Sequence, residues 1–385
     1  MKILIASDCY IFQTNGVTNV VITLSDELQA RGHDVRILAL ANENTSSRRE
    51  NAFLIRSVPT ILYPDFRISF ARRDPFLDEL KAWKPDLIHL HTEASIARLA
   101  YNIAKSAHAP LVVTTHTDYA KFCFGRFGDS ILIRGMAKLY GKLLYRRAQA
   151  VIVPSEKAHG LAMVQAAGNR VTVIPNGIML ERFQRPVSAE DRSALLRQYG
   201  FTDHGCTLVT VARISWEKNL MEILRYFPNL LKTLPQAQLL IVGDGPDRRR
   251  LEKYVARNGL SGQVRFTGRI DPEEIYRYYA SGDVFVSAST FETQGLTYLE
   301  ALACGLPMVC RDDPVLRNVL VNGENGYTYQ SEQEFTDGIA RITRDPRKWK
   351  EMHEKALKMS ANFGTASRVE QTLALYEQVL RLHSR

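Results

Sequence analysis

The sequence predicts an α/β protein made of two doubly wound domains, each built on a mostly parallel sheet. Short runs rich in Val, Ile and Leu alternate with helical patterns along the chain, which is typical of strand–helix–strand units. These runs are almost continuously apolar, as expected for strands buried on both faces. The chain has 385 residues, of which 45% are hydrophobic and 24% charged, a size and composition that suit two globular domains.

The first half shows this alternation from its first residues onward. A strand at 2–6 is followed by a loop with Asn15 and Gly16, and then by a helix over 17–31 that ends at Gly32, where glycine suits a left-handed cap. Further strands are expected at 35–40, 87–91, 111–116, 150–155 and 171–176. Helical stretches separate them, so we expect right-handed crossovers and a largely parallel sheet.

The pattern restarts after a segment that lacks apolar periodicity and contains Pro186, Gly200 and Gly205. Strands are expected at 207–213, 238–245, 264–268, 283–289 and 306–310, with helices at about 219–233, 246–258, 272–280 and 297–304. Two such Rossmann-like units in tandem would gather ligands in the cleft between them, outside the carboxyl ends of the strands.

These patterns predict a definite domain organisation. We expect a first domain over 1–185, a linker over 186–205 and a second domain over 206–365. Residues 366–385 carry apolar side chains at helical spacing, and we expect them to form an amphipathic helix that packs back on the first domain.

Charge and cysteine content limit the classes of partner. Residues 1–200 hold 26 basic and 18 acidic side chains, whereas residues 201–385 hold 24 and 23, so the first half is expected to face something anionic, either nucleic acid or a membrane surface. The five cysteines are scattered without a C-x-x-C pair, which favours reduced thiols in a cytoplasmic protein. No uncharged apolar run reaches the ~18 residues of a membrane-spanning helix.

The strongest functional motif lies at 290–307. A strand runs into a turn with Glu292 and Gly295, and then into a helix that contains Glu300. Free amides at the start of that helix would bind an anion or a sugar hydroxyl, and the two carboxylates suit a polyhydroxy ligand. An ordinary strand–turn–helix with exposed acids is the alternative.

Arg213 and Lys218 form a second motif, on a short turn just past the strand at 207–213. Two permanent cations there would suit a diphosphate, although a solvated loop is the alternative. The glycines at 243–245 follow the next strand, but they lack the complete G-x-G-x-x-G pattern and are weak evidence for a dinucleotide site.

Histidines near strand ends are further candidates. His116 ends the strand at 111–116, where an ordinary structural histidine is the alternative. His89 and His91 flank Leu90, so they are expected on opposite faces of a strand unless the strand ends between them, and we expect no zinc site there.

Residues 129–147 predict an amphipathic helix. Its basic residues recur every four positions and form one stripe beside an apolar arc: Arg134, Lys138, Lys142 and Arg146. This profile is typical of a helix in a membrane interface, where each basic residue contributes ~1 kcal/mol near anionic lipid. The alternative is a surface helix whose apolar face packs on its own sheet, but the charge of this half, with Arg67, Arg72 and Arg73, favours the membrane.

Together these segments resemble the retaining glycosyltransferases of family 4, which have the GT-B fold. The resemblance runs nearly from end to end and rests on an ordered set of positions: 15–17, 31–33, His116, 175–177, Arg213 with Lys218, 243–246, and Glu292 with Glu300. It implies an enzyme that displaces a nucleoside diphosphate from the anomeric carbon of a sugar.

The resemblance also implies roles for individual residues. The catalytic set would be Arg213 and Lys218 on the donor diphosphate, Glu292 on the donor sugar, and His116 facing that sugar from the opposite domain. The other donor-binding residues would be Gly16 at the phosphates, Arg269 and Ile270 at the base, the amides of Gln294, Gly295 and Leu296 at the sugar, and Glu300 at the ribose. In one departure, many members have an aromatic residue where this chain has Gln294.

No metal or other cofactor is expected, because family members work without a metal and this chain offers two cations but no Asp-x-Asp. We expect retention through attack from the face of the leaving group, since no nucleophilic carboxylate stands out for a double displacement.

The stretch at 289–301, the region of Tyr119 and the basic helix resemble the subgroup that glycosylates diacylglycerol, usually from UDP-glucose. This implies a peripheral enzyme on the inner face of the cell membrane, with no nucleic-acid partner. The alternatives are phosphatidylinositol with GDP-mannose, a polysaccharide or a small metabolite as acceptor. A non-catalytic basic protein that binds lipid or nucleic acid is the alternative of another class.

Overall fold

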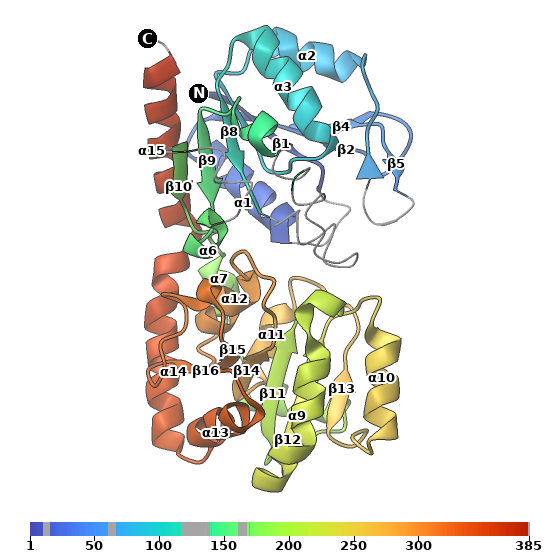
Figure 1. Cartoon of the computed structure of the whole chain (residues 1–385), viewed down its shortest axis with the longest axis vertical. Coiled ribbons are helices and arrows are strands. Elements are labelled where there is room, and N and C mark those ends of the chain that lie inside the picture. Colours follow the sequence, from blue (N-terminus) through green and yellow to red (C-terminus); the bar gives the residue numbers. More distant parts are fainter. Residues whose placement is uncertain are drawn as a thin grey trace. The chain divides into compact units, whose positions relative to one another are not determined.

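A computed structural model of the chain describes residues 1–10, 16–60, 67–116, 135, 139, 141–160, 168 and 170–383. The chain divides into two compact units (Figure 1). The first consists of Met1–Gly177 with Thr365–Arg385, and the second of Ile178–Gly364. Each unit contains a sheet of mainly parallel strands with helices packed against it, which confirms the predicted α/β class.

The sheet of the first unit has the strand order β10-β9-β8-β7-β1-β2-β4-β3. Its strands are β1 (Lys2–Ser7), β2 (Asp34–Leu40), β3 (Ser47–Arg49), β4 (Ala52–Ile55), β7 (Leu87–Leu90), β8 (Leu111–Thr114), β9 (Ala150–Val153) and β10 (Val171–Val173). Neighbours pair in parallel, except β3 with β4. A separate antiparallel pair joins β5 (Val58–Pro59) and β6 (Arg67–Ile68). The strand order reverses between β1 and β7.

Alternate residues of these strands face two layers of helix. Ile3 and Ile5 of β1 pack in a cluster with residues of α1 (Gly16–Ala30) and α15 (Thr365–His383). Leu4 and Ala6 pack on the other face with α2 (Pro75–Trp83) and α3 (Ser95–Ala107). The short helix α6 (Glu156–His159) follows β9. Both faces are therefore buried, which explains the nearly continuous apolar runs in the sequence.

The sheet of the second unit has the order β13-β12-β11-β14-β15-β16, and every neighbouring pair is parallel. Its strands are β11 (Cys206–Val211), β12 (Ala237–Val242), β13 (Val264–Phe266), β14 (Val284–Ser287), β15 (Met308–Arg311) and β16 (Gly326–Tyr329). The order reverses between β11 and β14. Ligands of such sheets bind outside the carboxyl ends of the strands at this switch point.

Helices cover both faces of the second sheet (Figure 1). They are α7 (Leu180–Phe183), α8 (Ala189–Gln198), α9 (Leu220–Thr233), α10 (Arg248–Arg257), α11 (Ile275–Ala280), α12 (Leu296–Ala303), α13 (Glu332–Thr343) and α14 (Pro346–Ser360). Leu239 and Ile241 of β12 pack with α9, α10 and α13, whereas Leu240 and Val242 pack with α8, α11 and α12. Short 3-10 helices lie at Trp216–Lys218, Pro314–Leu316 and Ala361–Phe363.

The domain boundary differs from the expected one. The first unit ends at Gly177 rather than at residue 185, and α8 occupies much of the segment 186–205 that we expected to be a linker. Leu195 and Leu196 of α8 are buried in the core of the second unit, and Arg192 pairs with Asp283 at 2.9 Å. Two buried leucines on a polar helix produce little apolar periodicity, which explains why the sequence pattern missed it. The closing helix α15 packs within the first unit.

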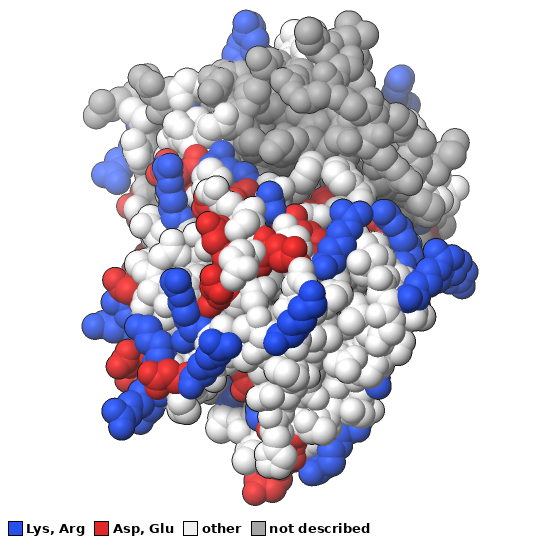
Figure 2. Space-filling model, turned by 60° about the horizontal axis from the view of Figure 1, so that its bottom comes forward, with Lys and Arg blue, Asp and Glu red and all other residues white. Residues whose placement is uncertain are grey.

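The net charge differs between the two units. The first holds 25 basic and 17 acidic residues, a net charge of +8, and the second holds 25 and 24, a net charge of +1. On the face of the molecule shown in Figure 2, Lys and Arg side chains stand among Asp and Glu side chains. The positive excess is thus a property of the first unit.

Candidate functional site

The switch point of the second sheet brings two of the predicted motifs together. The segment with Arg213 and Lys218 follows β11, and the segment with Glu292 follows the neighbouring strand β14. Lys218 Nζ lies 2.5 Å from Glu292 Oε1, and both side chains are mostly buried. The predicted diphosphate cation and the predicted sugar carboxylate therefore form one ion pair.

Further contacts hold these two loops together. The Trp216 ring packs edge-on against the Phe291 ring, with centroids 4.9 Å apart, and 41% of Trp216 is exposed. Ser289 Oγ donates to the Glu217 carbonyl at 3.4 Å. An aromatic pair thus lies directly beside the ion pair, with part of the indole open to solvent.

The glycines at 243–245 support the Arg213 loop. A Cβ atom at Gly243 would clash with the carbonyl oxygen of Ala212, and one at Gly245 with that of Ile214. Ile214 N donates to the Asp244 carbonyl at 2.9 Å. These glycines therefore let the loop after β12 approach the loop after β11 closely, which explains the motif without a dinucleotide.

The helix α12 begins at the predicted Gly295 and carries Glu300. Gly295 has φ +72°, a Cβ atom there would meet the Tyr298 ring, and no side chain caps the helix. The neighbouring Gln294 is buried, and Leu296 is the first helical residue. The N-terminus of α12 thus opens next to Glu292, at the position where the sequence predicted the helix to start.

Glu300 lies on the side of α12 that contacts α11. Tyr279 donates a hydrogen bond to Glu300 Oε2 at 2.6 Å. Burial raises the pKa of Glu300, whereas the Tyr279 hydrogen bond and the nearby charge of Arg182 act in the opposite direction. The hydrogen bond from Tyr279 therefore fixes the orientation of the Glu300 side chain.

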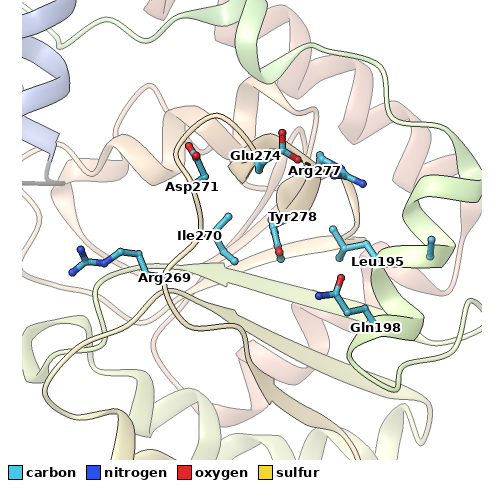
Figure 3. Close-up of a pocket in the computed structure, with 9 residues that line it drawn as sticks. Leu195, Gln198, Arg269, Ile270, Asp271, Glu274, Arg277 and Tyr278 are labelled. Carbon is cyan, nitrogen blue, oxygen red and sulfur yellow. Dashed lines mark hydrogen bonds and ion pairs between the residues drawn. The ribbon is translucent and has the colours of Figure 1, made fainter.

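Arg269 and Ile270 line a pocket of about 310 Å³ after β13 (Figure 3). The remaining lining residues come from α8, from α11 and from the turn before α11: Ala194, Leu195, Gln198, Asp271, Glu274, Arg277 and Tyr278. The side chains of Ile270, Leu195 and Tyr278 face one another, whereas Arg269 points away from them. The structure therefore separates the side chains of Arg269 and Ile270, and only Ile270 contributes to the apolar part of the pocket.

In the first unit, His116 lies two residues past β8, not within the strand. His116 Nε2 lies 3.0 Å from His91 Nδ1, and the two rings stack with centroids 5.2 Å apart. Burial, together with the charge of Arg368, lowers the pKa of His116 to about 3. His116 is therefore a neutral imidazole. Gly16 is exposed as the first residue of α1.

The expectation that His89 and His91 face opposite sides of a strand is wrong. Their ring centroids lie only 4.1 Å apart. The reason is that side chains two residues apart in an extended chain face the same side, so the alternation itself brings the two imidazoles together at the end of β7. Among the described residues, no three His, Cys, Asp or Glu side chains are arranged to hold a metal ion.

The predicted membrane helix is described only towards its end. Arg134, Lys138 and Tyr119 lie outside the described residues. Lys142 and Arg146 are exposed, as are Leu139 (59%) and Leu143 (53%). No described helix has both the length and the apolar character needed to span a bilayer.

The same short stretch is anchored to the sheet by one buried residue. Tyr145 is fully buried, and its hydroxyl donates to Glu93 Oε1 at 2.9 Å. Glu93 follows β7, so this hydrogen bond ties the base of the exposed segment to the carboxyl edge of the first sheet.

Comparisons with known proteins decide the family. The family model described as "Glycosyltransferase Family 4" matches residues 14–182, and the one described as "Glycosyl transferases group 1" matches residues 191–359. The alpha-monoglucosyldiacylglycerol synthase of Streptococcus pneumoniae is 34% identical over 94% of this chain and 84% of its own length. The chain belongs to glycosyltransferase family 4. It is therefore an enzyme, as the sequence predicted.

Two more relatives of this glycosyltransferase agree. The alpha-monoglucosyldiacylglycerol synthase of Acholeplasma laidlawii is 30% identical over 90% of this chain and 89% of its own length. The crystal structure of HepE from Anabaena in complex with UDP-glucose superposes with a TM-score of 0.76, at 21% identity, over 97% of this chain and 99% of that one. The GT-B fold is thereby confirmed.

Three residues of the glycosyltransferase were not among its predicted site residues. Tyr279 binds Glu300 from another helix, and nothing in its local sequence signals that contact. Trp216 lies between Arg213 and Lys218 in the sequence. An aromatic residue among cations at a strand end is a pattern from which its place in the site could have been predicted. His91 belongs to the His-Leu-His segment at the end of β7, which we had considered only as a metal site.

Proposed function

We propose that this glycosyltransferase moves glucose from UDP-glucose to diacylglycerol or a closely related lipid, with retention of configuration and without a metal. The observation that carries the proposal is the 34% identity, along nearly the whole chain, to an alpha-monoglucosyldiacylglycerol synthase. A second protein of that name matches over a similar length.

The chemistry centres on the leaving diphosphate. The bond between the anomeric carbon and the diphosphate oxygen breaks, and a bond from the same carbon to the acceptor hydroxyl oxygen forms on the same face. The proton of the acceptor hydroxyl passes to the departing diphosphate, so the atoms and charges of the transfer balance. Arg213 and Lys218 neutralise the developing negative charge. Removal of one such preorganised group typically costs ~2.7–4 kcal/mol of transition-state stabilisation.

Donor binding would rearrange the ion pair between Lys218 and Glu292. Lys218 Nζ would move partly away from Glu292 and bind the diphosphate. Glu292 would then accept hydrogen bonds from hydroxyl groups of the hexose. Glu300 would accept those of the ribose, held in place by Tyr279. Because two cations already compensate the diphosphate, the mechanism needs no divalent ion.

The first unit combines exposed apolar side chains with positive charge, two properties of surfaces that bind anionic lipid. Among the described residues, the large apolar side chains that are more than half exposed all belong to it: Phe70, Leu139, Leu143 and Leu382. Leu139 and Leu143 accompany the exposed cations Lys142 and Arg146, and this unit carries the net charge of +8. Exposed leucines beside cations support peripheral binding to the inner face of the membrane, where a lipid acceptor lies.

The test is a matrix of UDP-glucose, UDP-galactose and GDP-mannose against diacylglycerol, phosphatidylinositol and soluble acceptors, in anionic vesicles. Mass spectrometry identifies each product, and NMR assigns its anomeric configuration. We expect an α-glucosyl diacylglycerol, formed equally well in the presence of EDTA. Preferred transfer to phosphatidylinositol or to a soluble sugar, a β-linked product, or loss of activity with EDTA would each contradict part of the proposal.

A further inference from the structure

A compact cluster of imidazoles lies at the carboxyl edge of the first sheet. His89 and His91 are completely buried, and His116 packs on His91. His89 is bound on both ring nitrogens, by the Tyr376 hydroxyl at 2.5 Å and by Thr114 Oγ1 at 2.6 Å. His91 differs, because its Nδ1 contacts His116 Nε2 whereas its buried Nε2 has no hydrogen-bond partner in the part of the chain that the structure describes.

The surroundings of His91 keep it uncharged. The groups that face it are His89, His116 and the buried guanidinium of Arg368 from α15, and Glu93, two residues along, has its Oε1 engaged by Tyr145. Desolvation lowers the pKa of His91, and the neighbouring imidazoles and Arg368 lower it further. A neutral imidazole carries one N–H.

The position of that single proton follows from the contacts. A proton on Nε2 of His91 would leave a buried N–H without an acceptor, which is rare in proteins and costly. A proton on Nδ1 donates instead to His116 Nε2 at 3.0 Å. His116 then accepts at Nε2, and because it is also neutral, its own proton lies on Nδ1.

We propose that His91 is a positioning residue, which orients His116 and holds it as the neutral tautomer with its proton on Nδ1. This inference rests on the proposed function and on the role beside the donor sugar that the family resemblance implies for His116. It makes His116 a hydrogen-bond donor through Nδ1, not a base that accepts the acceptor's proton, in agreement with a transfer of that proton to the leaving diphosphate. Because His91 is completely buried, it would act on the reaction through His116.

The first test is spectroscopic and independent of activity. Nitrogen-15 NMR of the full chain, labelled at its nine histidines, reports which ring nitrogen carries the proton, and His116→Gln identifies the His116 signals. We expect a protonated Nδ1 and an unprotonated Nε2 in the unmutated protein, unchanged between about pH 8 and about pH 5, because the pKa of His116 is lowered to about 3. A proton on Nε2 of His116 would overturn the proposal.

Variants then assign the effect to His91. His91→Phe keeps a ring but removes the donor, so the His116 signals should shift towards a mixture of tautomers. His91→Asn places an amide N–H close to the position of Nδ1 and should restore the original signals. Thr114→Val is the matched control, because it removes a hydrogen bond of the same cluster, to His89, without touching the His91–His116 contact. Unchanged His116 signals in folded His91→Phe would contradict the inference.

Kinetics complete the test. We expect His91→Phe to lower kcat about tenfold to hundredfold, by analogy with the loss of residues that orient metal-ligating histidines, with the donor KM changed less than about twofold. His91→Asn should recover most of kcat. If the unmutated enzyme transfers no glucose, the proposed function fails while the NMR result still decides the tautomer. An equal loss in His91→Asn and His91→Phe would indicate a structural role alone.

Discussion

At the scale of single residues, the ion pair between Lys218 and Glu292 joins the two chemical tasks of the site. We predict that Lys218→Ala lowers kcat by about 10² to 10³, because a preorganised positive charge at the leaving group is lost. The melting temperature should also fall, because the mostly buried Glu292 carboxylate loses its contact with Lys218. Initial-rate kinetics and thermal unfolding measure the two effects.

A matched control for this variant exists in the same unit. Lys355 Nζ pairs with Glu324 at 2.6 Å, and neither residue lies at the switch point of the sheet. Lys355→Ala should leave kcat unchanged and change the melting temperature little, because that ion pair is about half exposed. If both variants lost activity equally, a role of Lys218 at the diphosphate would be refuted.

Tyr279 should control the pH dependence of donor binding. Its hydrogen bond opposes the burial that raises the pKa of Glu300, so Tyr279→Phe raises that pKa further. Glu300 must be ionised to accept both ribose hydroxyls, and the variant loses the ionised form earlier as the pH falls. We predict a donor KM close to normal at about pH 8 that exceeds the normal value increasingly towards about pH 5, above the ordinary Glu pKa of about 4.3.

The comparison for this prediction is Tyr199→Phe. The Tyr199 hydroxyl lies 3.2 Å from that of Tyr278, the residue before Tyr279, whereas the hydrogen bond to Glu300 comes from Tyr279. Its donor KM should follow the unmutated pH profile. A KM raised by the same factor at every pH in Tyr279→Phe would show that the tyrosine acts on packing and not on ionisation.

At the scale of elements, the central strands of both sheets could be predicted because strands buried on both faces have nearly unbroken Val, Ile and Leu runs. β16, α13 and α14 were not predicted, although Ser331 with Glu334 forms a capping box and Asp345 caps α14 ahead of a proline. Those signals are local and were readable. The prediction of a linker over 186–205 was wrong for a different reason, because α8 buries only one narrow side and so leaves little apolar periodicity in the sequence.

In the candidate site, too, some features could be predicted from the sequence and others could not. That charged residues follow strand ends could be read from the sequence, because parallel strands present their carboxyl ends at one edge. That Lys218 reaches Glu292, 74 residues away, depends on β11 and β14 being neighbours, which is a property of strand order and not of local pattern. The tyrosine on Glu300 comes from a third segment and depends on the same long-range packing.

The loop after β12 offers a test of how elements position the site. We predict that Gly245→Ala destabilises the second unit and raises the donor KM, because its Cβ atom would displace the backbone at Ile214, next to Arg213. Gly262→Ala is the control, since a Cβ atom there meets nothing within 4 Å and the φ angle is ordinary. Thermal unfolding and donor kinetics of both variants decide, and equal behaviour would contradict a close approach of the two loops.

At the scale of the whole molecule, one unit carries the positive excess and, among the described residues, the large apolar side chains that are more than half exposed, while the other carries the donor motifs and is nearly neutral. This division suits an enzyme whose donor is water-soluble and whose acceptor stays in a lipid surface. The binding surface and the transfer chemistry should then respond to different mutations, each detectable without the other.

The decisive measurement is vesicle binding after charge reversal at Lys142 and Arg146. Each basic residue near an anionic leaflet contributes about 1 kcal/mol, so Lys142→Glu with Arg146→Glu should weaken binding to anionic vesicles at least about thirtyfold. Reversal of Arg249 and Arg250, exposed on α10 of the second unit, changes the net charge equally and should have a much smaller effect. Equal losses would mean that total charge, and not this segment of the first unit, attracts the membrane. Vesicle sedimentation measures both variants, and their transfer to a detergent-dispersed acceptor should remain normal, because neither pair belongs to the proposed donor-binding residues.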